Sequence, residues 1–323
     1  MVKKTRLGNI NGIDDNKIQT FLGIRYGEPP INERRFKASV ASGGWKNTFE
    51  ATSFPNRAMQ LKLLDADGKK IPGQVSEDCL FMNIYTPKNM SKLAPVLVWM
   101  HGGAFKNGSA NEFDGSVLAE QQQVVVVTLN FRLGAFGFVD FSRFGAEYAG
   151  SASNGIRDAI LALQWIQDNI EEYSGDPSNV TISGESSGGT MVLSLLGCPS
   201  ANSLYQKAIA CSPTCAYRDL EDPTKKIRLA LNINTDDYLT PMLTMSPVDI
   251  CKLELGFGPH VDGEVIKEST FQSIKSRGVN GVPILIGSNS REGTLYTEGK
   301  DQDQPHYKLW NSGLAREMLL SLI

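Results

Sequence analysis

The chain of 323 residues is 41% hydrophobic and 21% charged, so it is long and apolar enough to bury a sizeable core, as one large domain or two ordinary ones. Its 32 lysines and arginines nearly balance 35 acidic residues, which leaves a net charge of −3. This balance gives no reason to expect a nucleic acid or an anionic membrane surface as a partner.

The N-terminal residues and the cysteines indicate the cellular compartment in which the protein is expected. Residues 1–8 carry positive charge with no apolar run behind them, and no stretch approaches about 18 consecutive apolar residues, so neither a secretory signal nor a membrane-spanning helix is predicted. The five cysteines fit no zinc-binding spacing, and Cys211 and Cys215 have no second pair that would complete a metal site. Free thiols in a reducing cytoplasm are therefore expected.

The first elements in chain order are β-strands and loops. Residues 5–24 alternate in polarity around Gly12 and Asp14-Asp15, which predicts a small β-hairpin. Residues 25–78 are rich in Gly, Pro, Asn and charge and predict irregular loops. Strands are then predicted at residues 80–85, 95–101, 124–129, 180–182, 207–211 and 282–286. The near-continuous apolar runs 95–101 and 124–129 are typical of strands buried on both faces of a mainly parallel sheet.

Helical patterns alternate with these strands. Residues 155–170 place apolar side chains at helical spacing, and residues 191–196 form a second apolar helix. Strands that alternate with helices predict an α/β fold with a parallel sheet. Residues 217–256 are polar and weakly periodic, so we expect a helical insertion there, within a single domain over residues 1–323.

The run Gly184-Glu185-Ser186-Ser187-Gly188 stands between a short strand and the apolar helix 191–196. Gly-x-Ser-x-Gly in that context is typical of a nucleophile elbow, a sharp turn that exposes the serine hydroxyl at the carboxyl end of the sheet. The five-letter pattern alone is common by chance, and the strand–turn–helix setting makes it specific. Ser186 is the predicted nucleophile.

A second signal follows the strand 95–101. In His101-Gly102-Gly103-Ala104-Phe105 small residues let the backbone approach a substrate carbonyl, as an oxyanion hole requires. The predicted donors are the N–H groups of Gly103 and Ala104, with a third from Ser187, while Gly102 and Phe105 would line the site. The alternative is an ordinary glycine-rich turn.

The acid and the base are less clear from the residues alone. A triad in such a fold runs in the order Ser, Asp or Glu, His. Glu292 follows the strand 282–286, where a catalytic acid would stand, although a solvated surface charge fits the same position. The three histidines are 101, 260 and 306. His101 precedes Ser186 and is expected to shape the glycine loop, and His260 is expected near the surface or the pocket wall.

The motifs together resemble type-B carboxylesterases, the group that includes cholinesterases and bacterial para-nitrobenzyl esterases. The resemblance runs through nearly the whole chain and rests on residues 21–30 (FLGIRYGEPP), 35–36 (RF), 76–85 (SEDCLFMNIY), 101–105 (HGGAF), 129–134 (LNFRLG), 154–158 (NGIRD), 175–177 (GDP) and 184–189 (GESSGG). It implies an α/β-hydrolase fold and carboxylic-ester hydrolysis through an acyl-serine intermediate, on small-to-medium acyl esters and without a cofactor or metal.

The resemblance also implies roles for charged residues. It makes Glu292 the acid of the triad, and it implies two structural ion pairs, Arg35 with Glu77 and Arg132 with Asp158. Glu185 matches a buried acid that lines the family's site, where it either serves a water network or a cationic intermediate or is merely structural. Residues 56–78 contain neither the cysteine nor the tryptophan that choline-specific members use, so choline specificity is not expected.

The base is the main departure from the family. His306 follows Glu292 by 14 residues (306 − 292), whereas in the family the catalytic histidine comes much further along, beyond one more strand. His306 is therefore a weak candidate, and the last strand and the catalytic-histidine region are expected to be missing from a truncated chain. The alternative to an ester hydrolase is a catalytically dead fragment or a non-enzymatic, cholinesterase-like binding protein. The oligomeric state is not predicted.

Overall fold

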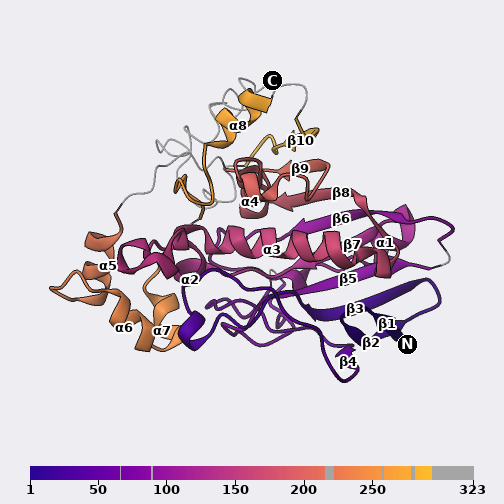
Figure 1. Cartoon of the computed structure of the whole chain (residues 1–323), viewed down its shortest axis with the longest axis horizontal. Helices are drawn as coiled ribbons and strands as arrows, with labels where there is room; N and C mark the ends of the chain where they lie inside the picture. Colours follow the sequence, from indigo (N-terminus) through magenta and orange to yellow (C-terminus); the bar gives the residue numbers. More distant parts are fainter. Residues whose placement is uncertain (66, 89, 215–221, 256–257, 278–280, 293–323) are drawn as a thin grey trace.

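One mixed β-sheet organises the molecule (Figure 1). The structure is a computed structural model, and it describes residues 1–292 apart from residues 66, 89, 215–221, 256–257 and 278–280. In sheet order the described strands are β1 (Val2–Thr5), β2 (Gly8–Asp14), β3 (Ile18–Arg25), β5 (Phe81–Pro87), β7 (Val125–Leu129), β6 (Ala94–Met100), β8 (Gly175–Glu185), β9 (Lys207–Cys211) and β10 (Ile284–Gly287), while β4 (Phe49–Ala51) pairs with β2.

The sheet has an antiparallel part and a parallel part. Strands β1, β2, β3, β5 and β7 pair antiparallel in that order, and β7, β6, β8, β9 and β10 pair parallel. Every residue of β7 is buried, as expected of a continuous apolar run covered on both faces. The predicted α/β architecture is confirmed, and each of the six predicted strands overlaps an observed one.

The predicted N-terminal hairpin is confirmed, because β2 and β3 pair antiparallel on either side of residues 15–17. Gly12 lies within β2 and not in a turn, and the chain reverses at residues 6–7 and again at residues 15–17. Glycine is needed at position 12 because a methyl group there would lie 2.6 Å from the Phe21 ring on the neighbouring strand. Close packing between strands, and not turn geometry, accounts for this glycine.

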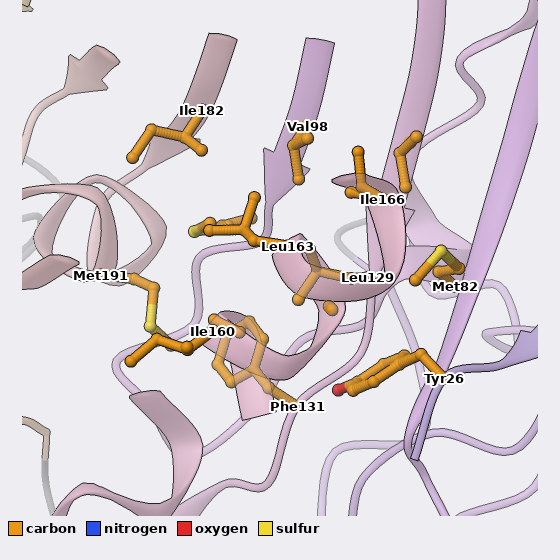
Figure 2. Close-up of a cluster of buried hydrophobic side chains, with 14 of the residues drawn as sticks. Tyr26, Met82, Val98, Leu129, Phe131, Ile160, Leu163, Ile166, Ile182 and Met191 are labelled. Atoms are coloured by element: carbon orange, nitrogen blue, oxygen red, sulfur yellow. The ribbon is translucent and has the colours of Figure 1, made fainter. Parts of the chain in front are cut away.

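Helices cover the sheet. The described helices are α1 (Ser116–Gln122), α2 (Gly134–Phe138), α3 (Asn154–Asn169), α4 (Ser187–Leu196), α5 (Thr224–Leu231), α6 (Leu239–Thr244), α7 (Pro247–Lys252) and α8 (Thr270–Arg277). Figure 2 shows Ile160, Leu163 and Ile166 of α3 beside core side chains of the strands, and all three belong to the main buried core. No helix in the described part of the chain combines the length and apolarity that crossing a membrane requires.

A second, smaller core lies where α5, α6 and α7 gather near α2, at the left of Figure 1. It joins Phe36 and Phe136 to Ile227, Tyr238 and Met242. These three helices fall within the range in which a helical insertion is expected, residues 217–256. The division of the chain into a domain and an insertion stays a prediction.

Two buried ion pairs fix loops to this framework, and both were expected from the sequence. The Arg35 guanidinium binds the Glu77 carboxylate, with 2.7 Å from Nε to Oε2. The Arg132 guanidinium binds Asp158 at 2.8 and 2.7 Å, and the two side chains are 3% and 0% exposed. The predicted pairs are confirmed.

Candidate active site

Ser186 stands at the junction of β8 and α4, with backbone angles φ 54° and ψ −122°. Few residues other than glycine adopt such a conformation, and it is strained for a side chain. Its N–H donates to Cys211 O at 2.9 Å, and its own carbonyl accepts from the Thr190 N–H at 2.9 Å. The turn is therefore held at both ends, by β9 and by the first turn of α4, and it keeps Ser186 partly exposed.

The glycines around Ser186 allow the elbow to pack against β6. A methyl group at Gly188 would lie 2.0 Å from Met100 O, and one at Gly184 would lie 2.4 Å from the Gly188 carbonyl carbon. Neither position has room for a side chain. The Gly-x-Ser-x-Gly spacing thus reflects the close approach of strand and helix on both sides of the serine.

Residues 101–108, here called the glycine loop, lie beside the elbow. A methyl group at Gly102 would lie 3.3 Å from Ser186 Cβ. Gly103 and Ala104 have positive φ, 110° and 56°, and both are exposed. No described residue accepts a hydrogen bond from the N–H of Gly103, Ala104 or Ser187. The glycine loop and the start of α4 thus carry three backbone N–H groups that no described residue accepts.

His101, the first residue of the glycine loop, is buried. Its ring stacks on Phe131 with 4.5 Å between the ring centroids, and Nδ1 lies 2.8 Å from Gly102 O. Burial lowers the pKa of His101 to about 4, so the imidazole is neutral near pH 7. The Nδ1–H tautomer donates to the Gly102 carbonyl, and these contacts hold the start of the loop.

Glu292 is anchored close to the elbow. Its Oε1 accepts hydrogen bonds from the Asn289 N–H at 2.6 Å and from the Ser212 hydroxyl. Ser212 directly follows Cys211, whose carbonyl accepts the Ser186 N–H, and the Ser212 N–H donates to Gly287 O at 2.6 Å. Ser186 and Glu292 therefore follow β8 and β10, the two strands on either side of β9, at the same edge of the sheet.

Ser212 is a site residue that the sequence interpretation missed. Its place immediately after the strand 207–211 was the available signal, because the carboxyl ends of neighbouring parallel strands meet at one edge of the sheet. Its hydroxyl would hold the Glu292 carboxylate in one orientation.

Glu185 lies on the exposed side of the elbow. Partial burial, and to a lesser extent the negative charge of Glu292, raise the pKa of its carboxyl. A methyl group at Gly102 would lie 2.8 Å from Glu185 Oε2, so the carboxylate rests against the glycine loop. The resemblance implies a buried acid at this position, whereas Glu185 is only partly covered by the described residues; its role stays a prediction.

The two remaining histidines are His260 and His306. His306 lies outside the described residues. His260 is partly buried in a segment that passes the glycine loop, since a methyl group at Gly258 would lie 2.9 Å from the Phe105 ring. In the described part of the chain, no group of three or more His, Cys, Asp or Glu side chains could hold a metal ion.

A family model described as the Carboxylesterase family matches residues 1–318. The chain belongs to the carboxylesterase family. Among curated relatives, this carboxylesterase-family chain is 36% identical over 311 residues to para-nitrobenzyl esterase of Bacillus subtilis (strain 168), covering 90% of the chain and 63% of the relative. It is 36% identical over 318 residues to human carboxylesterase 5A, covering 90% of the chain and 54% of the relative. The chain thus spans less than two-thirds of the length of these curated relatives.

Solved carboxylesterase-family structures share the fold. A thermophilic PNB esterase superposes with a TM-score of 0.85 at 36% identity, over 93% of this chain and 66% of that one. A carboxylesterase of Geobacillus stearothermophilus gives a TM-score of 0.82 at 34% identity, over 92% and 63%. The fold is the α/β-hydrolase fold, as the sequence predicts.

Proposed function

We propose that the protein is a carboxylic-ester hydrolase that forms an acyl intermediate on Ser186. The observation that carries the proposal is the strained backbone of Ser186 between β8 and α4, directly beside a loop with unpaired N–H donors. Strain of this kind persists at positions where a particular side chain must be presented. Membership of the carboxylesterase family supports the same chemistry.

In the proposed reaction the Ser186 Oγ attacks the acyl carbon while its proton passes to a base. The carbonyl oxygen becomes an oxyanion that accepts hydrogen bonds from the N–H groups of Gly103, Ala104 and Ser187; one such donor is typically worth about 3 kcal/mol in the transition state. Collapse breaks the ester C–O bond, and the alcohol leaves with the proton held by the base. Water then attacks the acyl-serine through the same base, releasing the acid and restoring the serine hydroxyl.

A histidine oriented by Glu292 is the proposed base. His101 does not suit this role, because its Nδ1 bonds to Gly102 and its ring is buried against Phe131. We assign the base to a histidine outside the described residues, either His306 or, in a longer protein, a histidine that follows residue 323. Small-to-medium acyl esters are the proposed substrates, and the chemistry requires no cofactor.

A cytoplasmic location and a single-domain organisation complete the proposal. The described residues Cys79, Cys211 and Cys251 carry free thiols, which supports a reducing compartment. The helices α5–α7 would form the insertion at residues 217–256 of one α/β-hydrolase domain.

Labelling with a fluorophosphonate probe tests the nucleophile. We expect covalent labelling of the natural full-length protein to be abolished by Ser186→Ala and retained by Ser142→Ala, which removes an exposed serine hydroxyl away from the elbow. Equal labelling of both variants would remove Ser186 from the mechanism. A full-length protein that takes up no probe would favour the non-enzymatic binding protein.

A further inference from the structure

One buried side chain outside the proposed triad forms hydrogen bonds with the backbone of the glycine loop. Gln60 is 3% exposed and comes from the loop that follows β4. Its Oε1 accepts from the Gly108 N–H at 3.1 Å, while its Nε2 donates to Gly108 O at 2.9 Å and to Ala58 O at 3.1 Å. The carboxamide therefore satisfies both polar groups of Gly108, as a neighbouring strand would.

Gly108 is the point at which the glycine loop closes on itself. It has φ +105°, and a methyl group there would lie 2.3 Å from Gly102 O and 2.4 Å from His101 Nδ1. Across the same turn, the N–H groups of Lys106 and Asn107 both donate to Gly103 O at 3.0 Å. The two ends of the loop are thus in contact, and a shift of Gly108 would move Gly102 and Gly103 with it.

The segment that carries Gln60 is itself fixed in place. Arg57, 1% exposed, pairs through its backbone with Gln74 and Ser76 at 2.7 and 2.9 Å. Its guanidinium donates to Gly73 O at 3.3 Å and to Lys62 O at 3.2 Å. Gln60 therefore reaches the glycine loop from a rigid support, as a group that sets the position of another must do.

We propose that Gln60 is a positioning residue for the oxyanion hole. The inference rests on the proposed function for its catalytic consequence, and it adds a residue that touches neither substrate nor Ser186. By clamping both polar groups of Gly108, Gln60 holds the closed turn and so fixes where the Gly103 and Ala104 N–H groups point. Donors of this kind are effective only when they are held in place before the reaction.

Hydrogen exchange of the glycine loop tests the positioning directly, without any need for catalysis. In Gln60→Ala we expect the amides of Lys106 and Asn107, which Gln60 does not contact, to exchange at least tenfold faster, together with Gly108. The matched control is Gln167→Ala, which removes a carboxamide that also donates to two carbonyls, Pro177 O and Leu204 O. If Lys106 and Asn107 keep their protection in Gln60→Ala, the proposal is overturned.

The variant Gln60→Glu keeps the proposal testable should Gln60→Ala fail to fold. A protonated carboxylic acid can donate and accept as the amide does, whereas a carboxylate can only accept. We expect the protection of Lys106 and Asn107 to be low near pH 8 and to return towards the wild-type level as the pH falls through the pKa of the new carboxyl. If the protection of the Lys106 and Asn107 amides in Gln60→Glu, relative to wild type, does not change with pH, the proposed role of Gln60 is overturned.

The rate of Ser186 labelling by the fluorophosphonate probe then measures the chemical consequence in the natural full-length protein. We expect it to fall about tenfold to a hundredfold in Gln60→Ala, because a small misplacement of groups at the reacting centre has effects of that size, and to stay at the wild-type level in Gln167→Ala. A loosened loop with unchanged labelling would overturn the catalytic part of the inference. A wild-type protein that is not labelled would instead refute the proposed function, and the exchange measurement would still decide the role of Gln60.

Discussion

The imidazole of His101 is a neutral group built into the support of the glycine loop. Its side chain is 5% exposed, it stacks on Phe131, and it donates to Gly102 O. Because burial disfavours the charged form, protonation of this ring destabilises the folded loop. The loop therefore has a built-in sensitivity to acid.

We expect the free energy of unfolding to show this sensitivity. Burial lowers the pKa of His101 from 6.5 to about 4, so the unfolded chain takes up a proton at a pH where the folded chain does not. The contribution of His101 is unaffected above pH 6.5 and becomes destabilising as the pH falls from 6.5 towards 4. At about 1.4 kcal/mol for each pKa unit, the loss approaches about 3 kcal/mol at pH 4.

Urea unfolding at pH 7.5 and at pH 4 checks this expectation in wild type and in His101→Phe, whose ring can keep the stacking contact without titrating. Other groups titrate in both proteins, so the difference between them isolates His101. Between pH 7.5 and pH 4, the free energy of unfolding should fall by about 3 kcal/mol less in the variant than in wild type. An equal loss in both proteins would mean that His101 is protonated in the folded state.

At this scale the sequence predicted the residues that belong to local motifs. Ser186 and Gly103 stand in runs whose neighbours identify them. Ser212 and Gln60 have no such run, because their roles arise when β9 meets β10 and when a loop of residues 57–76 folds onto the glycine loop. Contacts between residues so far apart in the sequence cannot be predicted from the periodicity or the spacing of residue types.

At the scale of elements, β6, β8 and α4 meet without intervening side chains around the elbow. The sequence predicted the strands and the helix here. It placed the strand that precedes the elbow at residues 180–182, whereas β8 spans Gly175–Glu185. The start of β8, Gly175-Asp176-Pro177, breaks the apolar pattern that periodicity relies on, so its extent could not be found that way.

The variant Gly188→Ala tests how closely β6 and α4 pack at the elbow. The added methyl group would lie 2.0 Å from Met100 O, which is backbone, so β6 and α4 must separate. We expect destabilisation of about 1–3 kcal/mol or more by thermal or urea unfolding. Gly43→Ala is the control, since no atom lies within 4 Å of the position its methyl group would take, and it should leave stability nearly unchanged. Similar stabilities for the two variants would show that the elbow has room to relax.

At the scale of the whole molecule, Arg132 ties together segments that are far apart in the chain. Besides Asp158, its guanidinium donates to Lys37 O at 2.6 Å and to Asn154 O at 3.5 Å. It thus joins the N-terminal loops, the segment after β7 and the start of α3. The family resemblance identified the pair, but the sequence could not show that the same guanidinium reaches Lys37.

The variant Asp158→Asn tests how much the Arg132–Asp158 ion pair contributes to the stability of the whole protein. Removing the charge leaves Arg132 buried without its counter-ion, and we expect a loss of about 3–5 kcal/mol in the free energy of unfolding. The exposed pair Lys17–Glu120, whose side chains are 67% and 40% exposed, provides the contrast. Glu120→Gln should change stability by less than about 1 kcal/mol. Losses of the same size for both would contradict the structural role given to Arg132.

The backbone of Ser186 has a consequence for how this lineage changes over time. A non-glycine residue in such a conformation costs the folded chain about 1–3 kcal/mol, and glycine would adopt it with less strain. In a lineage where nothing depended on the hydroxyl, substitution by glycine would favour folding and would be the expected drift. A serine at φ 54° therefore supports the proposal that the hydroxyl at this position is needed, because folding alone would favour glycine.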